Sequence, residues 1–348
     1  TTDTAMMRRM QAMRSGGNVL NILKAMAISE GAVAMLTSSP RFHDGTIFSQ
    51  GGGGYKGTDP ENFLDMAIGI EDYNTILRLV KAGKTVKLDA DVKTKFYNKD
   101  LQGYNVIAEI PGTDPVLKDE IVMLGGHYDS WHAGTGATDN GTGTITMMEV
   151  MRLLKKYYPN PKRTILVGHW GSEEQGLNGS RAFVEDHPEI VKNIQVLFNQ
   201  DNGTGRVVDL SGQGFLNAYD YLGRWLSKVP YDYKKEIKST FPGSPGGGGS
   251  DYASFVAAGA PAFSLSSLSW SYGNYTWHTN RDTYDKIVFD DLKSNAILTA
   301  IMVYMACEDN ATFPRDKADI GTDKRTGQPV QWPVQVKAMR TGPAVPKN

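Results

Sequence analysis

Four short runs of apolar residues recur in the middle of the chain, each bounded by polar or glycine-rich sequence. They cover residues 120–126, 163–170, 193–200 and 260–267. Continuous apolar runs of this length are typical of strands buried on both faces of a mainly parallel sheet. Residues 85–97 and 104–112 instead alternate apolar and polar positions. That alternation predicts an antiparallel pair of strands.

Helical periodicity appears between and after these runs. Residues 142–158 predict a crossover helix with a basic last turn. Its apolar positions are Ile145, Met148, Val150, Met151 and Leu154. Residues 290–309 predict the last strong helix. Because strands and helices alternate, we expect a three-layer α/β/α domain with a mixed, mainly parallel sheet.

The two ends of the chain differ from this middle part in their pattern of apolar and polar residues. Residues 1–84 predict small strands and helices around a glycine-rich loop at 51–54, with an amphipathic helix over 71–83. From Phe313 onward the chain is rich in Pro, Gly, Lys and Asp and has no periodicity. The predicted organisation is a small domain over 1–84, an α/β domain over 85–312 and a C-terminal arm over 313–348.

Composition narrows the classes of function. The 348 residues carry 37 basic and 38 acidic side chains, a formal net charge of −1, and one cysteine, Cys307. A nearly neutral chain has no strong positive electrostatic field that would attract nucleic acid or an anionic membrane, so neither partner is expected. No apolar run reaches the roughly 18 residues of a membrane span. A lone cysteine excludes a thiolate zinc cluster, so a metal must be held by His and carboxylates.

The beginning of the chain is unusual. It starts at Thr1 rather than Met, and its first ten residues do not form a signal peptide. We therefore expect a processed or truncated product of a longer precursor.

Side chains of the type that bind metals follow all four apolar runs. They are His127, Asp129 and Asp139 after the first run, Glu173 and Glu174 after the second, Asp201 after the third, and His278 beyond the fourth. In open α/β sheets, ligands bind outside the carboxyl ends of the strands, so we expect these side chains at one edge. Imidazole and carboxylate are the ligand set of a catalytic zinc site, or of two zinc ions sharing a carboxylate.

The adjacent glutamates are informative because neighbours in an extended segment point opposite ways. One of Glu173 and Glu174 can bind a metal while the other faces a metal-bound water. Two adjacent glutamates are usually a solvated loop, but this pair follows a predicted buried strand. Asp129 lies two residues from His127 and projects on the same side if the segment is extended, where it can orient the imidazole.

Five strings carry a family resemblance: GGHYDS, GTGATDNGTG, GSEEQGLNGS, FNQDN and WHTNRDT. In order and spacing they resemble the di-zinc aminopeptidase and glutamate carboxypeptidase family of metallopeptidases, over about residues 20–310. The resemblance implies a zinc-exopeptidase fold, two Zn²⁺ per chain and a peptide substrate. It also implies that residues 1–84 are the later part of an inserted protease-associated domain.

The resemblance also implies residue roles. It assigns His127 and Asp201 to one zinc, Glu174 and His278 to the other, and Asp139 to both. Glu173 becomes the general base and Asp129 the carboxylate behind His127, and the Asp139–Asn140 peptide bond is expected to be cis. The implied reaction is hydrolysis of a peptide bond next to a free terminus by a bridging hydroxide, as aminopeptidase, dipeptidase or carboxypeptidase.

Two positions depart from the family pattern. Tyr252, in GGSDYASF, stands where many relatives have His. Trp277 precedes His278 where some relatives have a Tyr that polarises the scissile carbonyl. Because Trp donates only through its indole N–H, Tyr275 or Tyr272 is the alternative donor.

Several alternatives stay open at this point. One is a single-zinc acyl-transfer cyclase on the same scaffold, and another is a receptor-like homologue that has lost catalysis. The intact set of metal-type residues counts against the second. The resemblance further implies a secreted or periplasmic protein, and a homodimer is compatible with it.

Overall fold

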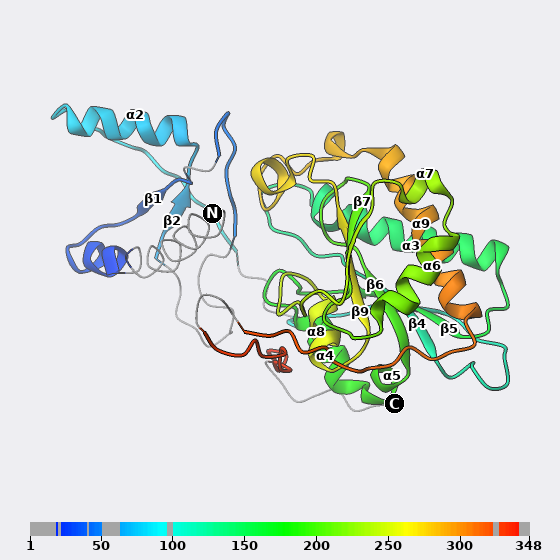
Figure 1. Ribbon diagram of the computed structural model, residues 1–348. Helices are drawn as coiled ribbons and strands as arrows, with labels where there is room; N and C mark the ends of the chain where they lie inside the picture. Colours follow the sequence, from blue (N-terminus) through cyan, green and yellow to red (C-terminus); the bar gives the residue numbers. More distant parts are fainter. Residues whose placement is uncertain are drawn as a thin grey trace. The chain divides into compact units, whose positions relative to one another are not determined.

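The computed structural model describes residues 19, 22–39, 42–50, 63–95, 100–322 and 327–340. The chain divides into two compact units, residues 1–90 and 91–348 (Figure 1). The glycine-rich loop at 51–54 lies outside the described residues. Among the helices that the structure describes, none combines the length and the apolar character needed to cross a membrane.

The first unit contains a small parallel sheet and an amphipathic helix. Strand β1 (Met35–Thr37) pairs with β2 (Asp65–Ala67), and residues 22–29 are helical. Helix α2 (Ile70–Lys81) confirms the helix predicted over 71–83. Its first turn is acidic and its last turn basic, which complements the helix dipole, and Gly83 follows it with a φ of 69°.

The second unit is built on a seven-stranded sheet with the order β3-β5-β4-β6-β9-β7-β8. The strands are β3 (Val106–Ile110), β4 (Ile121–His127), β5 (Thr164–Trp170), β6 (Ile194–Asn199), β7 (Val207–Ser211), β8 (Lys238–Thr240) and β9 (Ala262–Ser267). Four pairings are parallel, whereas β3 with β5 and β7 with β9 are antiparallel. The four apolar runs are therefore strands, and the mixed, mainly parallel sheet is confirmed.

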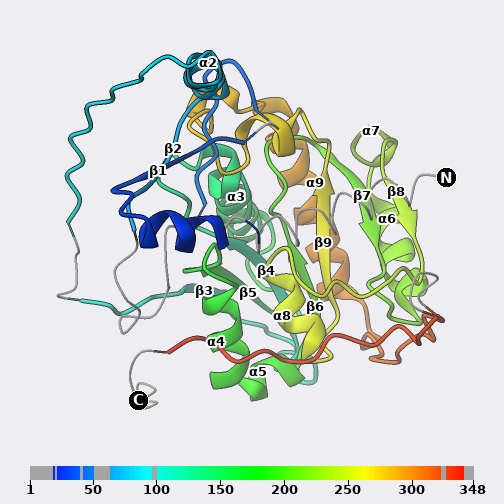
Figure 2. The ribbon, with the colours of Figure 1, turned by 90° about the vertical axis from the view of Figure 1, so that its left-hand side faces the viewer.

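Helices cover both faces of this sheet (Figure 2). On one face, α3 (Thr142–Tyr157) and α9 (Phe289–Glu308) contact the strands, and α6 (Arg224–Lys228) and α7 (Tyr231–Lys234) pack against α9. On the other face, α4 (Asn178–Asp186) and α8 (Tyr252–Ala257) contact the strands, and α5 (Pro188–Lys192) packs against α4. Short helical turns connect them: η1 (Ala137–Gly141), η2 (Tyr219–Gly223), η3 (Tyr272–Thr276) and η4 (Tyr284–Lys286). The three-layer α/β/α architecture is confirmed.

Two local predictions were wrong. No strand forms over residues 85–95, and β3 pairs with β5 instead. Every second residue of that segment from Lys87 to Lys95 is Lys or Asp, and apart from the partly buried Val86 all of its side chains are exposed. Pairing this segment would therefore bury little apolar surface. The helix predicted over 142–158 is confirmed as α3, but two of its predicted apolar positions, Ile145 and Met148, are exposed, and the buried stripe runs through Met147, Val150 and Leu154.

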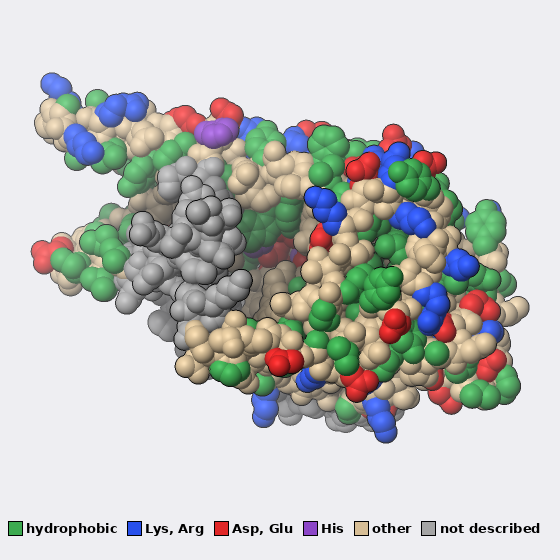
Figure 3. Space-filling model, viewed as in Figure 1, with side chains coloured by type: hydrophobic (Ala, Val, Ile, Leu, Met, Phe, Trp, Pro, Cys, Tyr) green, Lys and Arg blue, Asp and Glu red, His purple; other side chains and the backbone are tan. Residues whose placement is uncertain are grey.

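The surface agrees with the near-zero net charge. On the face that Figure 3 shows, basic and acidic side chains are interspersed rather than gathered by sign. This distribution offers no extended single-sign field on that face.

Candidate metal centre

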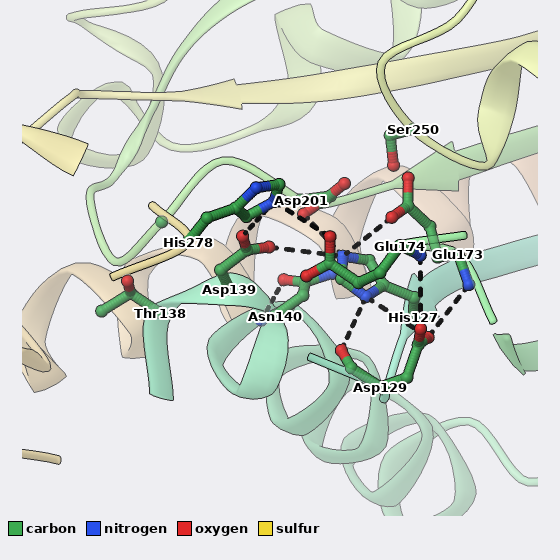
Figure 4. Close-up of polar contacts among 12 residues, drawn as sticks. His127, Asp129, Thr138, Asp139, Asn140, Glu173, Glu174, Asp201, Ser250 and His278 are labelled. Atoms are coloured by element: carbon green, nitrogen blue, oxygen red, sulfur yellow. Dashed lines mark hydrogen bonds and ion pairs between the residues drawn. The ribbon is translucent and has the colours of Figure 1, made fainter. Parts of the chain in front are cut away.

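Two neighbouring parallel strands bring the first pair of candidate ligands together. His127 is the last residue of β4, which is buried along its whole length, and Asp201 lies two residues beyond the end of β6. Because β4 and β6 run side by side in parallel, their carboxyl ends meet at one edge. His127 Nε2 lies 3.0 Å from Asp201 Oδ1, as Figure 4 shows.

Asp139 lies between the two candidate histidines. One carboxylate oxygen, Oδ1, is 3.5 Å from His127 Nε2, and the other, Oδ2, is 3.3 Å from His278 Nε2. The peptide bond between Asp139 and Asn140 is cis, as expected. One oxygen facing each imidazole is the arrangement that a bridging carboxylate needs.

A residue that the sequence reasoning missed supports this turn. The buried carboxylate of Asp282 accepts hydrogen bonds from the backbone N–H groups of Thr138 and Asp139, at 2.7 and 3.0 Å. Charge-assisted bonds of this kind are stronger than neutral ones. The signal was available, because Asp282 belongs to the WHTNRDT string that supplied His278.

The adjacent glutamates follow β5 and address different histidines. Glu174 Oε2 lies 2.9 Å from His278 Nε2, and Glu173 Oε2 lies 4.0 Å from His127 Nε2 (Figure 4). Both backbone N–H groups donate to the carboxylate of Asp129, at 3.1 and 3.2 Å. Asp129 therefore anchors the backbone of the glutamate pair.

The contact between Asp129 and His127 runs mainly through the main chain. His127 Nδ1 lies 3.0 Å from the carbonyl oxygen of Asp129 and 3.7 Å from its carboxylate. The residue expected to orient the imidazole by its side chain thus places its main-chain oxygen closest, and its carboxylate holds the neighbouring loop.

Burial and crowding of acids shift the pKa values in the centre. Burial raises the pKa of Glu173 to about 10, and the charges of Asp201 and Asp251 add to this shift against the opposing charge of His127. Burial acts against ionisation of Asp139 as well, yet hydrogen bonds from His127 and His278 lower its pKa. Buried carboxylates that disfavour one another's charge form an environment that a cation stabilises.

The donor set fits a metal. Two groups of residues, His127 with Glu173 and Asp201, and His127 with Asp139 and Glu174, each offer ligand atoms within 4.8 Å of one another. Among the described residues, Glu174 Oε1 is buried without a hydrogen-bond partner. Imidazole and carboxylate at this spacing suit zinc.

Asp251, in the GGSDYASF string, is a second residue that the sequence reasoning missed. It is fully buried, and within the described part of the chain neither carboxylate oxygen has a hydrogen-bond partner. Burial raises its pKa to about 7. The string was noted for Tyr252, whereas burial and the charge of its neighbour Asp251 raise the pKa of Glu173. Ser250 accepts a hydrogen bond from Asn199 Nδ2 at 2.9 Å.

The structure separates the two candidate tyrosines. The ring of Tyr272 lies against Gly203, where an added Cβ would come within 2.8 Å of it. Burial and the charge of Asp139 raise the pKa of Tyr272 well above its ordinary value. Tyr275 instead contacts the cations of Arg281 and Lys286, both 5.9 Å from its ring centre.

Comparison with known proteins places this arrangement in a family. Carboxypeptidase Q of Mus musculus is 28% identical over 83% of this chain and 59% of its own length. A probable leucine aminopeptidase 2 of Aspergillus oryzae is 30% identical over 58% of this chain and 40% of its own length. The chain thus spans about half the length of the curated relatives it matches.

Solved structures agree in fold. A peptidase M28 precursor from Shewanella amazonensis superimposes with a TM-score of 0.61 at 24% identity, covering 82% of this chain and 62% of that one. A zinc aminopeptidase from Bacillus subtilis gives a TM-score of 0.54 at 25% identity, covering 84% and 68%. The family model of peptidase family M28 matches residues 105–303, so the chain belongs to peptidase family M28.

Proposed function

We propose that the protein is a zinc-dependent exopeptidase that holds two Zn²⁺ ions. The observation that carries the proposal is Asp139, whose two oxygens face the imidazoles of His127 and His278 separately. A shared carboxylate between two histidine-containing groups is the ligand pattern of a two-metal hydrolase.

The candidate ligands divide into two halves. In the strand half, His127 and Asp201 hold one metal, and in the loop half, Glu174 and His278 hold the other, with Asp139 common to both. When bound, zinc polarises a substrate carbonyl and lowers the pKa of water. The buried walls exclude bulk solvent, since His127 is 1% and Asp139 3% exposed.

Glu173 acts as the general base. Its carboxylate faces His127 at 4.0 Å, a longer distance than the 2.9 Å between Glu174 and His278. Glu173 takes a proton from the attacking water as the new C–O bond forms. It then passes that proton to the amine nitrogen as the C–N bond breaks.

Tyr272 donates a hydrogen bond to the substrate carbonyl oxygen. The base of its ring lies beside Gly203, two residues beyond Asp201, and burial together with the charge of Asp139 raises the pKa of its hydroxyl. A donor aimed at the oxygen where charge develops stabilises the transition state.

The remaining proposals concern the protein as a whole. Residues 1–84 are the later part of a protease-associated domain, which their compactness as a separate unit supports. The protein acts as a secreted or periplasmic enzyme, as the resemblance implies, and a homodimer is compatible with it. Fractionation of the source cells and light scattering of the purified chain test the last two statements.

Hydrolysis of a peptide panel tests the activity and its direction. The panel contains dipeptides, peptides with a blocked amino end and peptides with a blocked carboxyl end, and zinc per chain is measured in parallel. We expect hydrolysis only next to a free end, loss of activity with a chelator and recovery with zinc. One zinc per chain with cyclisation of amino-terminal Gln would identify an acyl-transfer cyclase, and two bound zinc ions without turnover a receptor-like homologue.

A further inference from the structure

The imidazole of His278 is stacked on the indole of the residue before it. The ring centroids of Trp277 and His278 are 4.1 Å apart and the planes are 27° from parallel. Consecutive side chains on an extended backbone point to opposite sides. Here His278 has a φ of 57°, in the left-handed region that a residue with a Cβ rarely adopts. The left-handed backbone of His278 therefore accompanies the stacking of its ring on that of Trp277.

A second indole reaches the same imidazole from another loop. Trp131 lies two residues beyond Asp129, and its ring meets that of His278 edge-on, with centroids 6.1 Å apart and planes at 63°. Trp131 is only 8% exposed. The loop that begins at His127 thus contributes a contact to the other histidine of the centre.

The backbone around His278 is fixed by hydrogen bonds. Trp277 N donates to the carbonyl of Tyr272 at 2.9 Å, Thr279 N to that of Thr276 at 3.0 Å, and Thr138 Oγ1 to Thr276 Oγ1 at 2.9 Å. These bonds place the loop beside the turn of Asp139. These hydrogen bonds do not restrict rotation of the imidazole about its own side-chain bonds. The contacts with Trp277 and Trp131 restrict that rotation.

We infer that Trp277 and Trp131 are positioning residues that set the ring plane of His278 so that Nε2 addresses Glu174 and Asp139. The inference rests on the proposed metal centre. A ligand held beforehand in its binding orientation loses less rotational freedom when the metal binds. Aromatic contacts supply the orientation here, whereas in the strand half the carbonyl of Asp129 lies beside His127 Nδ1.

The first test measures zinc affinity by competition with a chromophoric chelator, which does not depend on peptidase activity. In Trp277→Ala we expect the affinity of one of the two metals to fall by about 10- to 100-fold, the size of effect known for groups that orient a ligand. The other metal keeps its affinity. Trp277→Phe retains a stacking ring and stays within about threefold of the unsubstituted protein.

Trp270→Ala is the matched control. Trp270 lies in the same loop, is 56% exposed and donates its indole N–H to Asp291 at 2.9 Å. Its loss loosens the loop without touching His278, so the affinity of both metals is expected to stay unchanged. Equal weakening in Trp270→Ala and Trp277→Ala would overturn the inference, as would unchanged affinity in Trp277→Ala.

The second test uses the metal-free protein, so that a failure of the inference and a failure of the proposed function can be told apart. The imidazole proton signals of His278, assigned from His278→Gln, are expected upfield because of the ring current of Trp277, and they move downfield in Trp277→Ala. Circular dichroism confirms that each variant is folded. If the unsubstituted protein binds no zinc, the proposed function fails, and with it the role in metal binding. Signals of His278 that do not respond to Trp277→Ala would refute the stack.

Discussion

His127 and His278 belong to the same candidate centre but stand on very different backbones. His127 ends a buried seven-residue strand with parallel neighbours on both sides. His278 follows a helical turn, has a left-handed backbone and is stacked on its neighbour. The strand half takes its geometry from sheet register, and the loop half from side-chain contacts. We therefore expect the loop half to be the more easily disturbed of the two.

The largest expected effect separates the two glutamates that face the two halves. Glu173→Gln should lower kcat by about 10²- to 10⁴-fold with both metals retained, because the amide keeps the shape but cannot take a proton. Glu174→Gln should lose metal as well as rate, since an amide is a poor zinc ligand. Zinc stoichiometry and kcat are measured for both variants.

Glu189→Gln is the control for this pair, because its side chain is 61% exposed on α5, and both measurements should be unaffected. Metal loss in Glu173→Gln with retention in Glu174→Gln would reverse the assignment. Activity of Glu173→Gln within about threefold of the unsubstituted protein would refute its role as the base.

The second prediction concerns the proposed carbonyl donor of the loop half. Tyr272→Phe removes only a hydroxyl and should lower kcat by about a hundredfold, the usual cost of losing one donor to a developing oxyanion. Zinc content should be unchanged. The affinity for a phosphonate transition-state analogue should fall by a similar factor, whereas the affinity for the product stays constant.

Tyr275→Phe provides the matched comparison, because Tyr275 contacts Arg281 and Lys286. It should retain nearly full activity. A larger loss in Tyr275→Phe than in Tyr272→Phe would show that the two tyrosines have been assigned in the wrong order.

The third prediction tests the link between the halves. In Asp129→Asn, an amide N–H₂ replaces one of the two oxygens that accept the N–H groups of Glu173 and Glu174. Two donors then face each other, so kcat should fall by about tenfold or more and zinc affinity should weaken. Both are measured with the assays used for the glutamate variants.

Asp114 offers a control outside the centre, because its carboxylate also accepts two backbone N–H groups, those of Val116 and Leu117, but both on the single oxygen Oδ1. Asp114→Asn should lower stability without changing kcat. A normal rate and normal zinc affinity in Asp129→Asn would mean that the glutamate pair holds its position without this carboxylate.

The same contrast explains what could be predicted from the sequence. Apolar runs of regular length predicted β4, β5, β6 and β9, because burial on both faces leaves a strong pattern. The ends of those strands then located His127, the glutamate pair and Asp201. His278 is different, since it lies eleven residues beyond the end of β9 and no periodicity points to a left-handed residue in a loop. Its place after the fourth apolar run made it a candidate, and the resemblance of WHTNRDT assigned its role.

Other features were missed for different reasons. Asp282 stands in the WHTNRDT string, but its role depends on backbone N–H groups more than 140 residues away in the sequence. Asp251 stands out only by its burial in the folded chain. The exposed face of α3 was mispredicted because its buried stripe includes Thr142 and Thr146, which a hydrophobic pattern omits. Thr142 is accommodated there by donating its hydroxyl to the carbonyl of Gly203 at 2.8 Å.

The smallest expected effect concerns the C-terminal arm, which reaches the loop of the glutamate pair. Arg340 pairs with Glu185 and Asp186 on α4 at 3.3 and 3.0 Å, and Met339 N donates to Asn178 Oδ1 at 3.0 Å. These pairs are partly exposed, so each stabilises the fold by about 1 kcal/mol or less. Arg340→Glu should therefore lower Tm by only about 2 to 4 °C.

The exchange variant Arg340→Glu with Glu185→Arg separates charge from packing. It restores one opposite-charge pair and should recover part of the lost Tm, as differential scanning calorimetry will show. Asn178 also donates to the carbonyl of Gln175 at 3.2 Å, so the arm is tied to the loop that carries both glutamates. Because Glu174 belongs to the loop half, zinc affinity there should fall slightly in Arg340→Glu, and that of the strand half should not. An equal loss of zinc affinity in both halves would mean that the arm stabilises the whole second unit. The difference between the two halves would then not depend on the contacts of the arm.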